Sequence, residues 1–271
     1  MDNIKTKEIS DEKIINLLAA WRKYNSVIAG IFTVLIIFVF PLVFHDYYYD
    51  ILVAKYIFYY GSVILMIVAM LAGVFFFLYK DKREIGGNAV KEMRSNAKLN
   101  ALKMSDWAMI IFLIAVTIST LQSEYRFESF WGNEGRYMGM FLILLYGISF
   151  FVISRCLRYR QWYLDTFLAG GIIACMIGIL HFFKIDPIGF KRGLVGDDYT
   201  IFTSTIGNIN TYTSYVAMVS GMGTVMFSVE KNKYRRLWYL VVAIISLFAL
   251  IVGISDNAYL ALLVLFGLLP L

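Results

Sequence analysis

Charged residues, prolines, cysteines and histidines are all scarce in this chain of 271 residues. Only 16% of the residues are charged and 60% are hydrophobic, whereas a soluble domain of this length needs more polar residues to cover its surface. Only three prolines are present, and the long Leu, Ile, Phe and Val runs favour helices over the alternating strands of a β-barrel. The composition therefore predicts an all-α, polytopic integral membrane helical bundle.

The two cysteines and two histidines leave little material for redox or metal chemistry. Cys156 lies in a basic segment and Cys175 in an apolar one, so they form neither a disulfide framework nor a metal-ligand spacing. His45 and His181 both lie near predicted span ends, where a histidine is more often an interface residue than a catalyst. The sequence also lacks a Ser-His-Asp spacing, an H-E-x-x-H motif, a phosphate loop and the Rossmann glycine pattern. We therefore expect no metal, no cofactor and no site for nucleotide chemistry.

Apolar runs that reach or approach the length of a membrane span occur eight times along the chain. A helix needs about 20 apolar residues to cross a hydrocarbon core roughly 30 Å thick. The predicted spans are residues 26–44, 56–79, 107–121, 137–153, 163–183, 210–228, 237–253 and 258–271. We expect residues 1–25 to form a cytoplasmic amphipathic segment and residues 26–271 to form one multi-span membrane domain.

Basic residues alternate in number from one connecting segment to the next. Nineteen of the 25 Lys and Arg residues lie in the N-terminal segment and in the segments near 80–106, 154–162 and 229–236. Because cytoplasmic segments carry the excess of Lys and Arg, this pattern places the N-terminus in the cytoplasm. It also predicts a cytoplasmic linker near 80–106 and outer loops near 122–136 and 184–209. The net charge of +6 thus serves orientation, and no nucleic-acid partner is expected.

Two of the cytoplasmic segments have the residue spacing of amphipathic helices. The apolar face of the first contains Ile14, Leu18 and Trp21, and that of the second contains Ala89, Val90, Met93 and Ala97. Both segments are predicted to be short helices that lie on the membrane surface.

In the first outer loop, Arg136 lies where the chain enters the fourth span, after Gly132 and Gly135, which permit tight turns. An arginine at this depth requires an anion, a carboxylate or carbonyl groups as partners. One interpretation is an interfacial arginine that pairs with Glu128, Glu134 or a lipid phosphate, and physical grounds alone favour it. The other is a residue that binds the substrate.

The second outer loop contains an adjacent basic pair, Lys191 and Arg192, followed by Asp197 and Asp198. One interpretation is a solvated loop whose charges compensate one another. The alternative is a basic pair that approaches a phosphate-bearing ligand.

The segment T-S-T-I-G-N-I-N-T-Y-T-S at residues 203–214 is unusually polar for this chain and leads directly into the sixth span. Either Asn208 or Asn210 is suited to cap that helix, because an Asn side chain accepts hydrogen bonds from first-turn N–H groups. The helix start also carries a partial positive charge that favours anions. Capping explains one Asn, and the sequence gives no structural reason for the remaining Thr, Ser and Asn residues.

Three short elements resemble those of the O-antigen ligase and polymerase family. Gly207-Asn208-Ile209-Asn210, followed by Tyr215, resembles its G-N-x-N element, with Ile209 where many members have Pro. Residues 131–139 (W-G-N-E-G-R-Y-M-G) resemble an outer-loop W-G…R-x-x-G region. Residues 255–260 (S-D-N-A-Y-L) resemble an S-R-[GA]-A-[WY]-L element in which Asp256 replaces the Arg. The resemblance extends from about residue 107 to the end of the chain.

The resemblance implies a membrane glycosyltransferase that moves a glycan from an undecaprenyl-diphosphate carrier to an acceptor on the outer side of the bacterial cytoplasmic membrane. Arginines bind the diphosphate in this family, and the reaction uses neither nucleotide nor metal. The candidate residues for binding the diphosphate or the glycan are Arg136, Lys191, Arg192, Gly207, Asn208, Asn210 and Tyr215. The catalytic residue is unknown.

The family also has a large outer loop, after further spans, that supplies the catalytic base. The sequence given ends before such a loop, so we expect a chain truncated relative to its relatives. Two other function classes stay open at this point. One is a transporter or flippase for a lipid-linked or anionic substrate, and the other is a non-catalytic membrane subunit.

Overall fold

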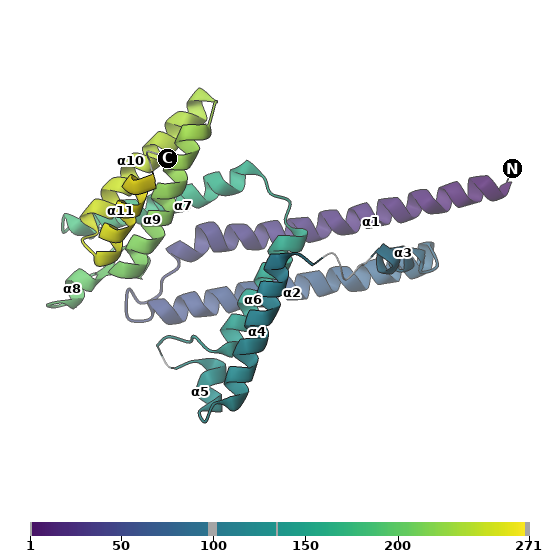
Figure 1. Ribbon diagram of the computed structural model, residues 1–271, viewed down its shortest axis with the longest axis horizontal. Coiled ribbons are helices and arrows are strands. Elements are labelled where there is room, and N and C mark those ends of the chain that lie inside the picture. Colours follow the sequence, from purple (N-terminus) through teal and green to yellow (C-terminus); the bar gives the residue numbers. More distant parts are fainter. Residues whose placement is uncertain (1, 97–101, 134, 269–271) are drawn as a thin grey trace. The chain divides into compact units, whose positions relative to one another are not determined.

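The computed structural model describes residues 2–96, 102–133 and 135–268, which are almost entirely helical (Figure 1). The helices are α1 (Asp2–Val34), α2 (Ile51–Glu84), α3 (Asn88–Asn96), α4 (Met104–Gln122), α5 (Arg126–Trp131), α6 (Met140–Cys156), α7 (Gln161–Phe182), α8 (Asp198–Ile201), α9 (Ile209–Val229), α10 (Lys233–Val252) and α11 (Asp256–Leu268). A π-helical turn, η1 (Leu35–Val39), and a 3₁₀ turn, η2 (Phe40–Leu42), extend α1. The predicted all-α fold class is confirmed.

The strand content within the described residues is one short hairpin. Strand β1 (Phe202–Thr203) pairs antiparallel with β2 (Gly207–Asn208), with Phe202 opposite Asn208 and Thr203 opposite Gly207. Gly207 has φ +100°, a conformation that a side chain would strain. The hairpin therefore sets the path by which the chain enters α9.

Within the described residues, each of the eight predicted apolar segments overlaps a helix. In the described part of the chain, five helical segments are long and apolar enough to cross a membrane: Asp11–Leu42, Ile51–Glu84, Met104–Gln122, Gln161–Phe182 and Lys233–Val252. Met140–Cys156 and Asp256–Leu265 are apolar but shorter. Helix α9 has 21 residues, several of them Asn, Thr and Ser, and is not among these five. The chain is thus a helical protein suited to a bilayer, and the count of eight spans stays a prediction.

The chain forms two compact units, described separately below. Unit 1 comprises residues 1–33 and 60–158, and unit 2 comprises residues 34–59 and 159–271. Helices α1 and α2 contribute to both units, because each is cut by the boundary between them.

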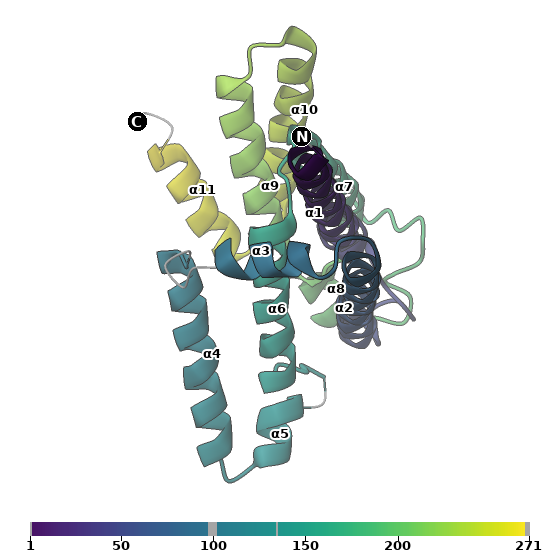
Figure 2. The ribbon, with the colours of Figure 1, turned by 90° about the vertical axis from the view of Figure 1, so that its right-hand side faces the viewer.

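In unit 1, helices α4 and α6 lie side by side (Figures 1 and 2). Gly147 of α6 permits this contact, because a Cβ atom there would lie 2.7 Å from Leu113 of α4. At one end of the pair, the buried Asp106 accepts a hydrogen bond from the Lys103 N–H (2.7 Å) and pairs with Arg155. The carboxylate thus caps α4 and ties it to the last turn of α6.

The apolar faces predicted for the two cytoplasmic segments form a small core in unit 1. Ile14 and Leu17 of α1 pack against Phe77 of α2, Ile85 in the turn that follows α2, and Ala89 of α3. The carboxylate of Asp81 fixes α3 by accepting hydrogen bonds from the N–H groups of Ala89 (3.0 Å) and Val90 (3.1 Å). The N-terminal segment is not a separate helix, because α1 runs unbroken through it into the first span. Met93 is exposed and Ala97 lies outside the described residues.

Unit 2 is built around the packing of α7, α9, α10 and α11 (Figure 1). The side chains at the centre of its core are fully buried: Leu168, Cys175, Tyr212, Val216, Val219, Tyr239, Val242, Ala249, Leu250 and Ala258. Glycines allow the helices to approach closely, since a Cβ atom at Gly178 would lie 2.0 Å from the Tyr212 hydroxyl and one at Gly223 would lie 2.9 Å from Val242. Cys175 and Cys156 are both free thiols.

The polar groups of unit 2 gather at its two ends. We call the end formed by residues 40–55, 181–214 and 252–258 the loop end. We call the opposite end the clasp end, after a hydrogen-bonded cluster of Gln161, Asp165, Glu230, Arg235 and Tyr239. In the clasp, Arg235 donates to Asp165 (2.8 Å) and to Gln161 (2.7 Å), and the Tyr239 hydroxyl donates to Asp165 (2.7 Å). Gln161 donates to Glu230 (2.9 Å), so the segments that precede α7 and α10 lie at the same end.

Candidate functional site

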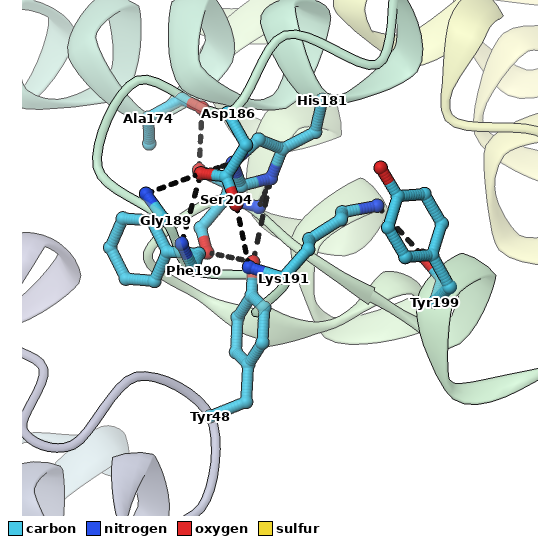
Figure 3. A network of polar contacts seen from close by, with 9 residues as sticks. All are labelled: Tyr48, Ala174, His181, Asp186, Gly189, Phe190, Lys191, Tyr199 and Ser204. Atoms are coloured by element: carbon cyan, nitrogen blue, oxygen red, sulfur yellow. Dashed lines mark hydrogen bonds and ion pairs between the residues drawn. The ribbon is translucent and has the colours of Figure 1, made fainter. Parts of the chain in front are cut away.

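Ser204 is the centre of the loop end, and its polar groups all bond within the protein (Figure 3). Its N–H donates to His181 Nδ1 (3.1 Å), its carbonyl accepts from the Tyr48 hydroxyl (2.9 Å), and its own hydroxyl donates to the carbonyl of Ala174 (2.6 Å). The neighbouring Thr205 hydroxyl donates to the carbonyl of Pro41 (2.9 Å). The Thr-Ser-Thr run is buried and ties the hairpin to α7 and to the end of η2. These hydrogen bonds give the Thr-Ser-Thr run the structural reason that the sequence alone does not show.

His181 is held by contacts to both ring nitrogens. Because the Ser204 N–H donates to Nδ1, a neutral His181 carries its proton on Nε2, which faces Asp186 Oδ1 at 3.5 Å. The side chain is completely buried, and the Phe190 ring packs edge-on against it. The residue types of a Ser-His-Asp triad are present, but the Ser204 hydroxyl bonds to Ala174 and not to His181. Nδ1 is occupied by the Ser204 N–H, and Nε2 is buried beside Asp186 without a hydrogen bond within the described residues, so the histidine positions the loop.

Asp186 organises the loop that follows α7. Its Oδ1 accepts from the N–H groups of Gly189 and Phe190 (2.9 Å each), and its Oδ2 accepts from that of Lys191 (2.7 Å). Partial burial acts to raise the pKa of this carboxyl, but the three N–H donors and His181 outweigh it and hold the pKa below its usual value. The charged carboxylate is thus the form that the folded loop stabilises.

Tyr48 completes the network from the segment before α2. It is buried between the rings of Phe190 and Phe202, at centroid distances of 5.5 and 5.2 Å. Burial, and then the charge of Asp186, raise the pKa of the Tyr48 hydroxyl, so it remains a donor to Ser204. Nearby, the buried ammonium of Lys55 donates to the carbonyls of Phe40 (3.1 Å), Pro41 (3.3 Å) and Val43 (2.9 Å). Lys55 therefore satisfies the carbonyl groups where η2 ends.

The predicted basic pair divides into two different environments. Lys191 donates to the carbonyl of Tyr199 (2.7 Å), and its ammonium lies 4.4 Å from the centre of that ring. Partial burial lowers the pKa of Lys191, and the charge of Asp186 acts in the opposite direction. Arg192 is exposed, and within the described residues its side chain has no hydrogen bond or ion pair. Of the pair, Arg192 is the cation available to an external anion.

Asn208 is the residue that caps α9. Its side chain accepts a hydrogen bond from the N–H of Asn210 (2.9 Å), which decides between the two asparagines that the sequence offered. The backbone carbonyl of Asn210 accepts from the hydroxyls of Thr213 (3.2 Å) and Ser214 (2.8 Å). Both asparagine side chains are exposed at the helix start.

The start of α11 lies against the start of α9. The hydroxyls of Thr213 and Ser255 are 2.8 Å apart, although the residues are separated by 42 positions in the sequence. Ser255 also caps α11 by accepting from the Ala258 N–H (3.2 Å), and the Asn257 side chain donates to the carbonyl of Asn210 (3.5 Å). Two helix starts with their partial positive charges therefore share the loop end.

The last two predicted site residues lie elsewhere. Tyr215 points into the packed interior of unit 2, where its ring meets Phe167 edge-on at 5.8 Å. Its hydroxyl is buried and has no hydrogen-bond partner within the described residues. Arg136 belongs to unit 1 and is exposed. It has no ion pair with Glu128 among the described residues, and Glu134 lies outside them.

The loop around Arg136 is closed by glycine contacts. Gly132 and Gly135 have φ values of +87° and +85°, which confirms the predicted tight turns. A Cβ atom at Gly139 would lie 2.4 Å from the Gly132 N atom, so the two ends of the loop meet backbone to backbone. The glycines of this motif thus have a structural role that does not depend on any ligand.

Sequence reasoning missed most of the residues that build the loop end. The position of His181 near a span end is that of an ordinary interface residue. Tyr48, Lys55 and Asp186 belong to no motif that predicts a buried polar network. One local pattern does point to this contact. His181 lies near the end of α7, and Asp186-Pro187 follows five residues later, so a turn between them brings the carboxylate back to the histidine ring. The described residues hold no group of three or more side chains suited to a metal ion. Comparisons with protein-family models, with curated proteins and with solved structures gave no match.

Proposed function

We propose that the chain is the membrane part of a glycosyltransferase of the O-antigen ligase or polymerase type, and that its loop end holds an undecaprenyl-diphosphate-linked glycan. The proposal rests on one observation: two segments, each of which resembles a different motif of this family, contact each other in the structure. The start of α9, with Gly207–Asn210, and the start of α11, with Ser255–Leu260, are joined by the Thr213–Ser255 hydrogen bond.

The proposal places all eight apolar helices across the bacterial cytoplasmic membrane, with the N-terminus in the cytoplasm and the loop end outside. The clasp supports this arrangement, because it brings the basic segments beside α7 and α10 to one end of unit 2. The loop end then faces the side on which lipid-linked glycans are transferred.

The chemistry requires charge stabilisation at a leaving diphosphate. An acceptor hydroxyl forms the new bond to the anomeric carbon, the bond to the diphosphate oxygen breaks, and the hydroxyl proton passes to a base that this proposal does not assign. Negative charge grows on the diphosphate as the bond breaks, so nearby positive groups accelerate the step. The starts of α9 and α11 and the exposed Arg192 supply such groups at the loop end of unit 2. Arg136, in unit 1, is a candidate from the family resemblance alone.

The test is a transfer assay in proteoliposomes that contain the full chain and a lipid-linked glycan. We expect release of undecaprenyl diphosphate together with lengthening of the acceptor glycan. Arg136→Ala and Arg192→Ala should each lower the rate without lowering the amount of inserted protein, whereas Lys184→Ala, another exposed cation of the same loop, should not. Unchanged rates in both arginine variants would refute the assigned roles.

A non-catalytic membrane subunit is the second candidate, and one observation favours it. The Thr-Ser-Thr run, His181 and Lys191 are all engaged in bonds within the protein. Binding of the lipid diphosphate without any release of glycan would support this candidate against the first.

A further inference from the structure

A groove in unit 1 between α1 and α2 has no role in the function proposed above. Its volume is about 410 Å³. The residues that line it include Ala20, Trp21 and Tyr24 from α1, and Gly73, Phe76 and Lys80 from α2. The volume lies in the range of roughly 300–1,000 Å³ that holds small ligands in proteins.

The groove is a consequence of how α1 rests on α2. The Tyr24 hydroxyl donates to the carbonyl of Ala69 (2.7 Å), and Trp21 packs against Phe77 at a centroid distance of 5.2 Å. A Cβ atom at Gly73 would lie 2.3 Å from the Tyr24 ring, so the glycine lets this ring lie on α2. The contacts hold α1 along one side of α2 and leave an aromatic channel beside them.

The exposed surroundings of the groove are apolar. Phe75 and Phe76 of α2 are 71% and 66% exposed. The groove is also lined by Trp21 and Tyr24, residue types that are typical of the membrane–water interface, where the hydrocarbon and headgroup regions meet. By the predicted topology this part of α2 lies at the cytoplasmic face, whose lipids are anionic.

Charge enters the groove at one end only. Lys80 is the one charged residue that lines the groove. Lys13 lies on α1 one turn before Leu17, a lining residue. The neighbouring Asp81 is buried and satisfied by the N–H groups of Ala89 and Val90, so it does not face the groove. Glu84 lies 4.0 Å from Lys80, and because both side chains are about half exposed this pair is weak.

We propose that this groove binds one anionic phospholipid, with an acyl chain along the aromatic wall and the phosphate at Lys80. The apolar channel suits the chain and the single lysine at its end suits the headgroup. Zwitterionic lipids offer the same chain without the net negative charge, so the proposal predicts selectivity for anionic headgroups.

Trp21 lines the groove and therefore reports on its occupant. The experiment uses the full chain in liposomes, with the other four tryptophans replaced by Phe and folding checked by circular dichroism. Quenching of Trp21 fluorescence is compared between brominated phosphatidylglycerol and brominated phosphatidylcholine at equal mole fractions. We expect about a fivefold preference for phosphatidylglycerol, which matches the attraction of one lysine to an anionic membrane surface.

Three variants separate the groove from general surface charge. Lys80→Gln should abolish the preference, whereas Lys82→Gln, which removes an exposed lysine two residues away outside the groove, should retain it. Ala20→Phe should fill the groove and lower quenching by both lipids. Native mass spectrometry of the chain with all five tryptophans should show the same order for retained phosphatidylglycerol. Equal quenching by the two lipids, or an equal loss of preference in Lys80→Gln and Lys82→Gln, would overturn the proposal.

Discussion

The two ends of unit 2 hold their polar groups in different ways. At the clasp end, the bonds of Gln161, Asp165, Glu230, Arg235 and Tyr239 run mainly from side chain to side chain. At the loop end, the bonds of Tyr48, Lys55, His181, Asp186 and Thr205 run mainly from side chain to backbone. Bonds between side chains fix helices to one another, whereas bonds to backbone fix the path of a loop.

This difference predicts different results from mutation. Loss of one clasp residue leaves other members that still bond to each other, so the effect should be small. Loss of one residue at the loop end leaves buried N–H or carbonyl groups without partners, and such groups are costly. The predictions below start with the largest expected effect.

Replacement of His181 by Ala should have the largest effect. It removes the acceptor for the Ser204 N–H and opens a cavity beside Phe190, so we expect a loss of about 3 kcal/mol in the free energy of unfolding. Denaturant titration of the purified chain in detergent measures this loss. His45→Ala is the matched control, because the His45 side chain is 78% exposed. Equal stability of the two variants would contradict the role given to His181.

Asp186 should make the loop sensitive to acid. Its pKa is lowered in the folded state, so its stabilising effect is complete above its ordinary pKa and is lost as the pH falls through the folded value. A spin label at Val195→Cys, an exposed position of the same loop, should become more mobile below about pH 4, near the ordinary carboxyl pKa.

Two variants test whether Asp186 is the titrating group. In Asp186→Asn the label should be mobile at neutral pH already, with no acid step, and we expect a loss of about 2 kcal/mol in stability. Asp197→Asn should keep the acid step. Persistence of that step in Asp186→Asn would assign it to another group.

Removal of one hydroxyl from the clasp should have a smaller effect. Tyr239→Phe loses the hydrogen bond to Asp165, but Arg235 still bonds to that carboxylate, so we expect a loss of about 1 kcal/mol. Tyr234→Phe, an exposed tyrosine of the same helix, is the control for the denaturant titration. A loss as large as that of His181→Ala would remove the contrast between the two ends.

Helix caps at the two ends allow the finest comparison. Asn208 accepts from one N–H of α9, whereas Asn232 accepts from two N–H groups of α10. Each change to Ala should cost at most about 1 kcal/mol, with the larger loss at Asn232, and each change to Asp should restore most of it. Thermal unfolding in detergent would detect the order, and a reversed order would show that the cap bonds do not determine the difference.

The sequence predicted the local features of this structure better than the contacts between distant segments. Helix positions followed from apolar runs, because a helix satisfies its own backbone and depends mostly on local sequence. A cap at Asn208 or Asn210 also followed from local pattern, and the structure shows that it is Asn208. The contacts of Tyr48, His181 and Thr205 join segments up to 164 positions apart, and no local pattern encodes such pairs.

The polar run before α9 shows that composition alone does not tell residues that anchor a loop from residues that face a ligand. The sequence offers no structural reason for its Thr and Ser residues, whereas in the structure Ser204 and Thr205 anchor the hairpin to α7 and to η2. Of the predicted site residues at the loop end, Asn208, Asn210 and Arg192 are exposed. The structure therefore narrows the predicted set, and substrate binding by these residues stays a prediction.

The most direct test of the proposed diphosphate binding at the loop end is equilibrium binding of radiolabelled undecaprenyl diphosphate to the full chain in detergent, with undecaprenyl monophosphate as the competitor. The account predicts saturable binding that favours the diphosphate, weakened severalfold by Arg192→Gln and unaffected by Lys233→Gln near the clasp end. Binding that does not saturate, or that treats the two lipids alike and ignores Arg192→Gln, would contradict it.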